Sequence, residues 1–158
     1  MRSTKSRAGA ALLATGALVI GTSAMVGAQS PSAGAGANVA YLSASSANTW
    51  LAASKAEMDK IAAENGITLT EFDAQFNADT QTAQLQDAIA SGQYQGLIVA
   101  ALNGVGLLPD LQAAAADGMK IVALNQIIGP ALDTADPQDP AILASVLAPP
   151  LRLSLIHI

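Results

Sequence analysis

The chain has 158 residues and a formal net charge of −5; 51% of its residues are apolar, 3% are aromatic and none is cysteine. This length fits one domain with a sizeable core, and the missing cysteine excludes disulfides, thiolate nucleophiles and cysteine-bound metals. The acidic balance argues against a nucleic-acid partner, because phosphate contacts need clustered Lys and Arg.

The N-terminus has the three parts of an export signal. Three basic residues precede an apolar run at 8–20, and small residues at 26–28 form a small-x-small cleavage site. The run is shorter than the ~20 residues that span a bilayer. We therefore predict a signal peptide over 1–28, cleaved after Ala28. The mature chain is then periplasmic or extracellular, without stable membrane insertion.

A flexible Gly/Ser-rich tether is expected over 29–37. Four apolar runs follow, and the first three begin about 30 residues apart, which is the length of a strand, a crossover helix and two loops. The runs predict strands that begin near Val39, Ile67, Leu97 and Ile121.

The stretches between the runs have the periodicity of amphipathic helices, expected over 48–65, 79–91 and 107–116, with Asp79 as N-cap of the second. Alternating strands and helices predict an α/β fold, an open parallel sheet with helices on both faces. Right-handed crossovers give the strand order 2-1-3-4, in which ligands bind outside the carboxyl ends of the strands.

The last thirty residues differ in composition. Residues 129–140 are rich in Pro and Asp, and the apolar run over 141–148 is a candidate further strand. The final segment, 151–158, carries the only histidine and has no turn residues. We interpret it as a non-native tail, read through from a sequencing adapter; a genuine short edge strand is the alternative.

Several kinds of chemistry lack their residues. The loop after the first strand contains no glycine, so it is not a phosphate cradle. Nucleophilic catalysis needs a positioned base, and His157 lies in the anomalous tail. Asp133, Asp136 and Asp139 are only loosely spaced for a metal, and we expect them to solubilise a linker. We predict no catalytic residue, no cofactor, no metal and no enzymatic activity.

Uncharged polar residues instead follow the strands at their carboxyl ends, with two aromatic residues beside them. Amides both donate and accept hydrogen bonds, as a ligand with many hydroxyls requires, and aromatic rings can stack on the C–H face of a sugar. The predicted ligand-binding residues are Ser45, Asn48, Trp50, Phe76, Asn103, Asn125 and Gln126.

Each of these residues also has a purely structural interpretation. Asn48, Asn103 and Asn125 are typical helix caps. Trp50 is equally suited to packing the first helix on its neighbour, and Phe76 to covering the sheet edge. Ser45 is an ordinary loop residue. The sequence leaves these alternatives open, and only the convergence of the set on one rim favours a binding site.

The segments NVAYLSAS…NTW and FDAQFNADTQTAQLQDAIASGQYQGLIVAALN resemble the N-terminal lobe of periplasmic sugar-binding proteins of the ribose-binding type. The resemblance implies two α/β lobes that enclose a sugar or polyol and deliver it to the membrane permease of an ABC transporter. Asn48, Trp50 and Asn103 match ligand-contacting positions. Asn125 and Gln126 stand where many relatives have Asp-Arg, which leaves the ligand open.

The same resemblance assigns 38–128 to the N-terminal lobe and 129–150 to a hinge and the start of a missing second lobe. We therefore expect a monomeric fragment that offers half a cleft and binds sugar weakly or not at all, because tight sites bury ~70–90% of a small ligand. The alternatives are a ligand-sensing domain for a membrane signalling partner and, with less support, a flavodoxin-like α/β enzyme.

Overall fold

The computed structural model describes residues 36–147, which form a five-stranded parallel sheet and three helices. The predicted signal peptide, most of the tether and the final tail lie outside the described residues. The strands are β1 (Asn38–Ser43), β2 (Thr68–Asp73), β3 (Gly96–Val99), β4 (Lys120–Asn125) and β5 (Ile142–Leu147). The helices are α1 (Thr49–Glu64), α2 (Ala78–Ser91) and α3 (Gly104–Ala116).

The sheet has the order β2-β1-β3-β4-β5, which confirms the predicted order of the first four strands. β5 pairs in parallel with β4 at the edge of the sheet. It lies in the stretch that the sequence assigns to a hinge, so the lobe extends beyond residue 128. The sequence missed this pairing because the connection before β5 contains no helix that would mark a crossover.

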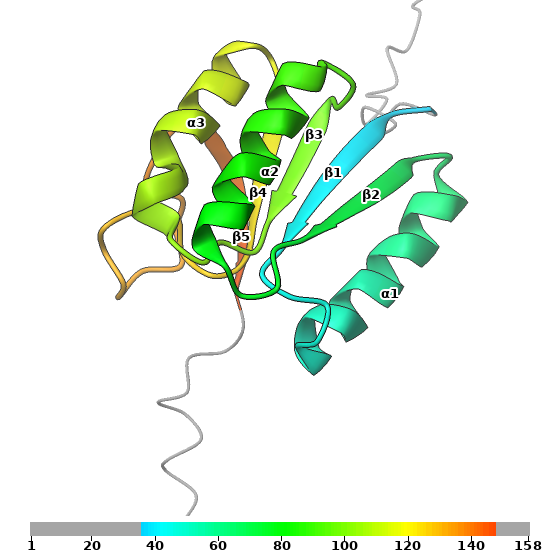
Figure 1. The fold of residues 1–158 in the computed structure, drawn as a ribbon, viewed down its shortest axis with the longest axis horizontal. Coiled ribbons are helices and arrows are strands. Elements are labelled where there is room, and N and C mark those ends of the chain that lie inside the picture. The colour runs from blue at the N-terminus through cyan, green and yellow to red at the C-terminus, as the bar shows by residue number, and fades with distance from the viewer. Residues whose placement is uncertain (1–35, 148–158) are drawn as a thin grey trace, which may run out of the picture. The chain divides into compact units, whose positions relative to one another are not determined.

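The helices cover the two faces of the sheet unequally. α2 and α3 lie side by side on one face, whereas α1 packs on the other face near β2 (Figure 1). The crossover from β1 to β2 runs in one direction along the sheet, and those from β2 to β3 and β3 to β4 run in the opposite direction. Because such crossovers are right-handed, the first helix must lie on the face opposite the other two.

Both faces of the sheet are apolar, as expected for parallel strands covered by helices. The larger core cluster joins the inner sides of α2 and α3 to β1, β3 and β4, with Leu85, Leu97 and Leu111 almost fully buried. A smaller cluster beneath α1 contains Tyr41 and Leu51. The core is built largely from Ala and Leu, which brings the helices close to the sheet.

An asparagine side chain caps the N-terminus of each of the three helices. Asn77, rather than the predicted Asp79, is the N-cap of α2: its side chain accepts from the Thr80 N–H. Asp79 lies in the first turn instead, where a carboxylate interacts favourably with the helix dipole. α3 begins at Gly104, three residues before its predicted start, because Asn103 caps it.

Truncation of the core should unfold the lobe far more readily than the same change at the surface. We expect Leu111→Ala to lower the free energy of unfolding by about 2–5 kcal/mol, since it removes buried methyl groups and leaves a cavity. Leu132→Ala is the matched control, because Leu132 is 82% exposed. Urea denaturation followed by circular dichroism measures both; equal losses would contradict the assigned core.

Candidate functional site

The carboxyl ends of the central strands are level with one another. The register pairs Ser43 of β1 with Asp73 of β2, and Leu42 of β1 with Val99 of β3, which in turn pairs with Ala123 of β4. Adjacent strands lie ~4.8 Å apart, so the four ends span about 14 Å. All seven predicted ligand-binding residues lie at these strand ends, in the loops that follow them or in the first turns of the next helices. We call this part of the molecule the carboxyl edge.

Asn48 and Asn103 cap α1 and α3, as the structural alternative requires. The Asn48 Oδ1 accepts from the N–H groups of Trp50 and Leu51, both at 3.0 Å. The Asn103 Oδ1 accepts from the Gly106 N–H at 2.9 Å. Capping uses only the oxygen of each amide. Within residues 36–147, the Nδ2 groups of both side chains make no hydrogen bond, so both can still donate to a ligand.

Asn125 ends β4 in a tight turn. Its φ is +64°, and the N–H of Gln126 donates to the carbonyl of Leu124 at 2.7 Å, which closes a γ-turn around Asn125. No helix follows Asn125 in the described sequence, so the capping alternative is wrong for this residue. γ-turns with positive φ are rare and strained, and such strain is concentrated at functional sites.

The loop between β2 and α2 is strained in a similar way. Gln75 and Phe76 both have positive φ, at +51° and +60°, a conformation that costs an ordinary residue ~1–2 kcal/mol. Two hydrogen bonds at 2.8 Å hold them: the Gln75 N–H donates to Asp73 Oδ1, and the Phe76 N–H donates to the Ala44 carbonyl. The loop therefore presents Phe76 with 59% of its surface exposed.

Trp50 and Ser45 lie beside this loop in different environments. Trp50, in the first turn of α1, is 39% exposed. Ser45 is only 3% exposed, and its Oγ accepts from the Ala47 N–H at 3.2 Å. Its carbonyl accepts from the Asn48 N–H at 3.1 Å. Ser45 thus shapes the loop, and of the predicted residues it offers a ligand the least surface.

Sequence reasoning overlooked Asp73 at this edge. The Ser46 hydroxyl donates to one carboxylate oxygen, and the Gln75 N–H donates to the other. The Ser46 bond, followed by the backbone bond, holds the pKa of Asp73 below its usual range. The charge therefore persists in mild acid and ties the loop after β1 to the loop after β2. A Ser and an Asp in consecutive strand-end loops were the only hint in the sequence.

Beneath α1, two hydroxyl groups are buried. Tyr41 Oη and Ser43 Oγ have no hydrogen-bond partner within the described residues, and both residues are inaccessible to solvent. Burial is the main factor that raises the pKa of Tyr41; nearby Ser43 lowers it, and the charges of Glu71 and Asp73 raise it further. Tyr41 is therefore a neutral group at physiological pH.

Removal of the Ser46 hydroxyl should raise the pKa of Asp73 toward its ordinary value. The lowered pKa stabilises the fold above the unfolded-state pKa, and this contribution is lost as the pH falls through the folded-state pKa. We expect Ser46→Ala to shift the NMR titration of the Asp73 carboxylate to higher pH. An unmoved Asp73 titration would contradict the assigned bond.

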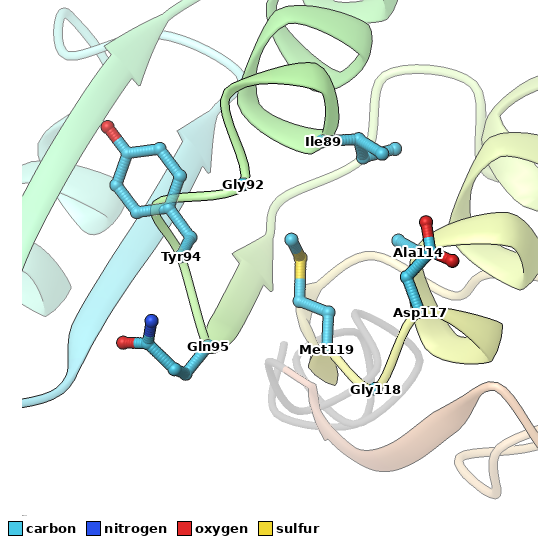
Figure 2. A pocket seen from close by; sticks show the side chains of 8 residues that line it. All are labelled: Ile89, Gly92, Tyr94, Gln95, Ala114, Asp117, Gly118 and Met119. Atoms are coloured by element: carbon cyan, nitrogen blue, oxygen red, sulfur yellow. The ribbon is translucent and has the colours of Figure 1, made fainter.

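One hollow of about 310 Å³ lies at the opposite, amino edge of the sheet (Figure 2). It is lined by the C-terminal ends of α2 and α3 and by the loops that lead into β3 and β4, including Tyr94, Asp117 and Met119. None of the seven predicted residues contributes to it. We place the candidate site at the carboxyl edge because the strained turns and exposed aromatic rings are there, whereas the hollow lies where the strands begin.

Residues 36–147 contain no group of three or more His, Cys, Asp or Glu residues arranged to hold a metal ion. No helix in this range is both long enough and apolar enough to cross a bilayer.

Several solved structures of solute-binding proteins resemble this chain in fold. A galactofuranose-binding protein superposes with a TM-score of 0.60 at 21% identity, over 71% of this chain and 36% of its own. An ABC transporter solute-binding protein from Clostridium phytofermentans with bound β-D-glucose gives 0.59 at 18%, over 70% and 31%. One from Mycobacterium smegmatis with bound glycerol gives 0.54 at 23%, over 63% and 34%.

These structures establish the α/β fold of the lobe, and the sequence establishes the family. Residues 39–141 match the periplasmic binding protein domain, and the chain belongs to this family. The resemblance expected from the sequence is confirmed. No curated protein matches the chain in sequence. The chain spans about a third of the length of the solved structures it resembles.

Proposed function

We propose that this chain forms one ligand-contacting lobe of an exported protein that binds a neutral sugar or polyol for the permease of an ABC transporter. The observation that carries the proposal is the carboxyl edge itself. Uncharged amides and two exposed rings lie there, on loops and helix starts that hydrogen bonds hold in place although some backbone conformations are strained. Membership of the periplasmic binding protein family supports export and the transporter partner.

The free amide donors suit hydroxyl oxygens. The Nδ2 groups of Asn48 and Asn103 have fixed positions because the Oδ1 atoms of the same side chains cap helices. Gln126, directly after β4, adds an exposed glutamine amide. The exposed rings of Trp50 and Phe76 supply flat apolar surfaces for the C–H face of a sugar ring. Ser45 serves this site by shaping the loop that carries Asn48.

The charges at this edge favour a neutral ligand. Among residues 36–147, Lys55 pairs with Asp59 at 2.6 Å, Lys60 lies farther along α1, and Lys120 begins β4 at the opposite edge. No lysine therefore lies in the carboxyl-edge loops to neutralise an acidic ligand. Sugars and polyols are also the molecules named with several of the structural neighbours, among them β-D-glucose, glycerol, D-allose and L-rhamnose.

One lobe can cover only one side of such a ligand. Tight small-molecule sites bury ~70–90% of the ligand, so this chain alone should bind in the millimolar range, which corresponds to about −4 kcal/mol. A second lobe after a hinge would supply the remaining contacts and the tight binding. We expect the lobe on its own to be monomeric and to bind sugar weakly.

Sugar titrations followed by amide NMR shifts test the proposal. With D-glucose, L-rhamnose and D-allose, we expect saturable shifts at Asn48, Phe76, Asn103 and Asn125 for at least one sugar, and none at Tyr94 or Met119 across the sheet. Shifts confined to the amino-edge hollow, or no shifts with any of the three sugars, would contradict the proposed site.

Asn103→Asp separates binding from capping. Aspartate retains an oxygen that caps α3 but loses the Nδ2 donor, so we expect sugar affinity to fall about tenfold with little change in thermal stability. Asn77→Asp makes the same substitution at the cap of α2 and should leave affinity nearly unchanged. Equal affinity losses in the two variants would show that the Asn103 donor has no special role.

A further inference from the structure

Gln81 is the most deeply buried polar side chain of α2. Neither Gln81 nor its hydrogen-bond partners are among the seven predicted ligand-binding residues. The residue is 0% exposed, although the long, polar side chain of glutamine usually lies at the surface. Its amide makes two hydrogen bonds to the strand-end backbone: Nε2 donates to the Ala100 carbonyl at 3.0 Å, and Oε1 accepts from the Leu102 N–H at 2.8 Å.

These two backbone groups are the next members of the ladder between β1 and β3. The Ala100 N–H still donates to the Leu42 carbonyl, at 2.9 Å. If a parallel ladder continued, the Ala44 N–H would donate to the Ala100 carbonyl and the Ala44 carbonyl would accept from the Leu102 N–H. The Ala44 carbonyl instead accepts from the Phe76 N–H on the β2 side.

The chain thus leaves the ladder at Ala44, and the Gln81 amide takes the place of that residue. A glutamine amide has one carbonyl and N–H donors, the same groups as the missing peptide. Without it, the buried Ala100 carbonyl and the partly buried Leu102 N–H would lack partners, and an unpaired buried polar group destabilises the fold. This need explains why a polar residue occupies the apolar side of α2, one turn before Leu85.

We call the two hydrogen bonds from the Gln81 amide to the Ala100 carbonyl and the Leu102 N–H the clamp. The clamp ends one residue before Asn103. From there the loop is confined on its other side as well: a Cβ added to Gly104 would lie 2.3 Å from the Ile127 carbonyl oxygen, so the two loops are in close backbone contact. Ile127 follows Asn125 and Gln126 directly. The loop after β3 is therefore held between the Gln81 amide and the loop after β4.

We propose that Gln81 is a positioning residue for the binding site: its side-chain amide replaces one residue of β1 and thereby fixes the Leu102 backbone and the Nδ2 donor of Asn103. This inference rests on the proposed function for the role of Asn103. It concerns a residue that does not itself reach the ligand.

Gln81→Glu provides the central test. The carboxylate can still accept from the Leu102 N–H, but it cannot donate to the Ala100 carbonyl and instead repels it. We expect hydrogen exchange at the Leu102 and Asn103 amides to become about tenfold faster than in the unmodified chain at the same neutral pH. The affinity for whichever of D-glucose, L-rhamnose and D-allose binds the unmodified chain should fall by a similar factor.

Acidification should reverse this loss. Burial raises the pKa of a carboxyl group above its ordinary value of about 4.3, and the protonated carboxyl group of the Gln81→Glu variant both donates and accepts, as the glutamine amide does. Protection at Leu102, compared with the unmodified chain at each pH, should recover as the pH falls through the pKa of the introduced carboxyl group. A general loss of packing would show no such recovery.

Gln84→Glu is the matched control, because Gln84 lies on the same helix and its Nε2 donates to the Asp73 carbonyl of the other loop at 2.9 Å. It should change exchange near Ala74 and not at Leu102. In the unmodified chain, a scalar coupling across the hydrogen bond between the Leu102 nitrogen and the Gln81 side-chain carbonyl carbon gives a readout that needs no variant.

The outcomes separate the two proposals. Absence of that coupling, unchanged exchange at Leu102 in Gln81→Glu, or an equal effect of Gln84→Glu at Leu102 would overturn the role of Gln81. If these readouts hold while D-glucose, L-rhamnose and D-allose all fail to bind the unmodified chain, the clamp stands and the proposed function fails. Sugar binding that is unaffected by Gln81→Glu would overturn the positioning role alone.

Discussion

The structure depends on the point where the parallel ladder between β1 and β3 ends. The chain leaves β1 toward α1 on one face of the sheet and leaves β3 toward α3 on the other. Right-handed crossovers require this divergence wherever the strand order reverses, and in open α/β sheets ligands bind outside the carboxyl ends of the strands at such a point. The backbone groups exposed by the separation must still find partners, and Gln81 supplies them for Ala100 and Leu102.

Several hydrogen-bonded contacts hold the loops at these strand ends in place. Asn48, Asn77 and Asn103 fix the first turns of the three helices. Asp73 joins the loops after β1 and β2 through Ser46 and the Gln75 N–H. Such cross-links allow residues with positive φ to persist at the same edge, since strained conformations survive only where the surroundings over-determine them. A rigid rim with free amide donors can bind a small polar ligand without a large ordering cost.

The distribution of charge explains why the edge suits a neutral ligand. Three helix N-termini point toward it, and such termini attract anions. Here asparagine oxygens already accept from the first N–H groups of each helix, and the carboxylates of Asp73, at the end of β2, and Asp79, in the first turn of α2, disfavour an anionic ligand. The asparagine oxygens thus occupy N–H groups that could otherwise bind an anion, and the asparagine amides offer neutral donors instead.

The sequence by itself determined the strands, the helices, the order of the first four strands and the rim on which the candidate residues gather. Local periodicity and the fixed hand of crossovers are sufficient for these features. Gln81 lies on the same side of α2 as Leu85 and Ala88, but its burial was not predicted, because a glutamine side chain usually lies at the surface. Only the tertiary structure decided its partners, because they come from the end of β3, about twenty residues away along the chain.

The same distinction holds elsewhere at the edge. Asn48 and Asn103 could be recognised as caps from their own neighbourhoods. By contrast, Phe76, with its positive φ, donates to the Ala44 carbonyl of a distant loop, and no sequence pattern predicted the γ-turn at Asn125. β5 joined the sheet through pairing with β4, which no local pattern specifies. Sequence encodes what short-range sterics and periodicity dictate; register at an edge and the pairing of diverging loops arise only when distant segments meet.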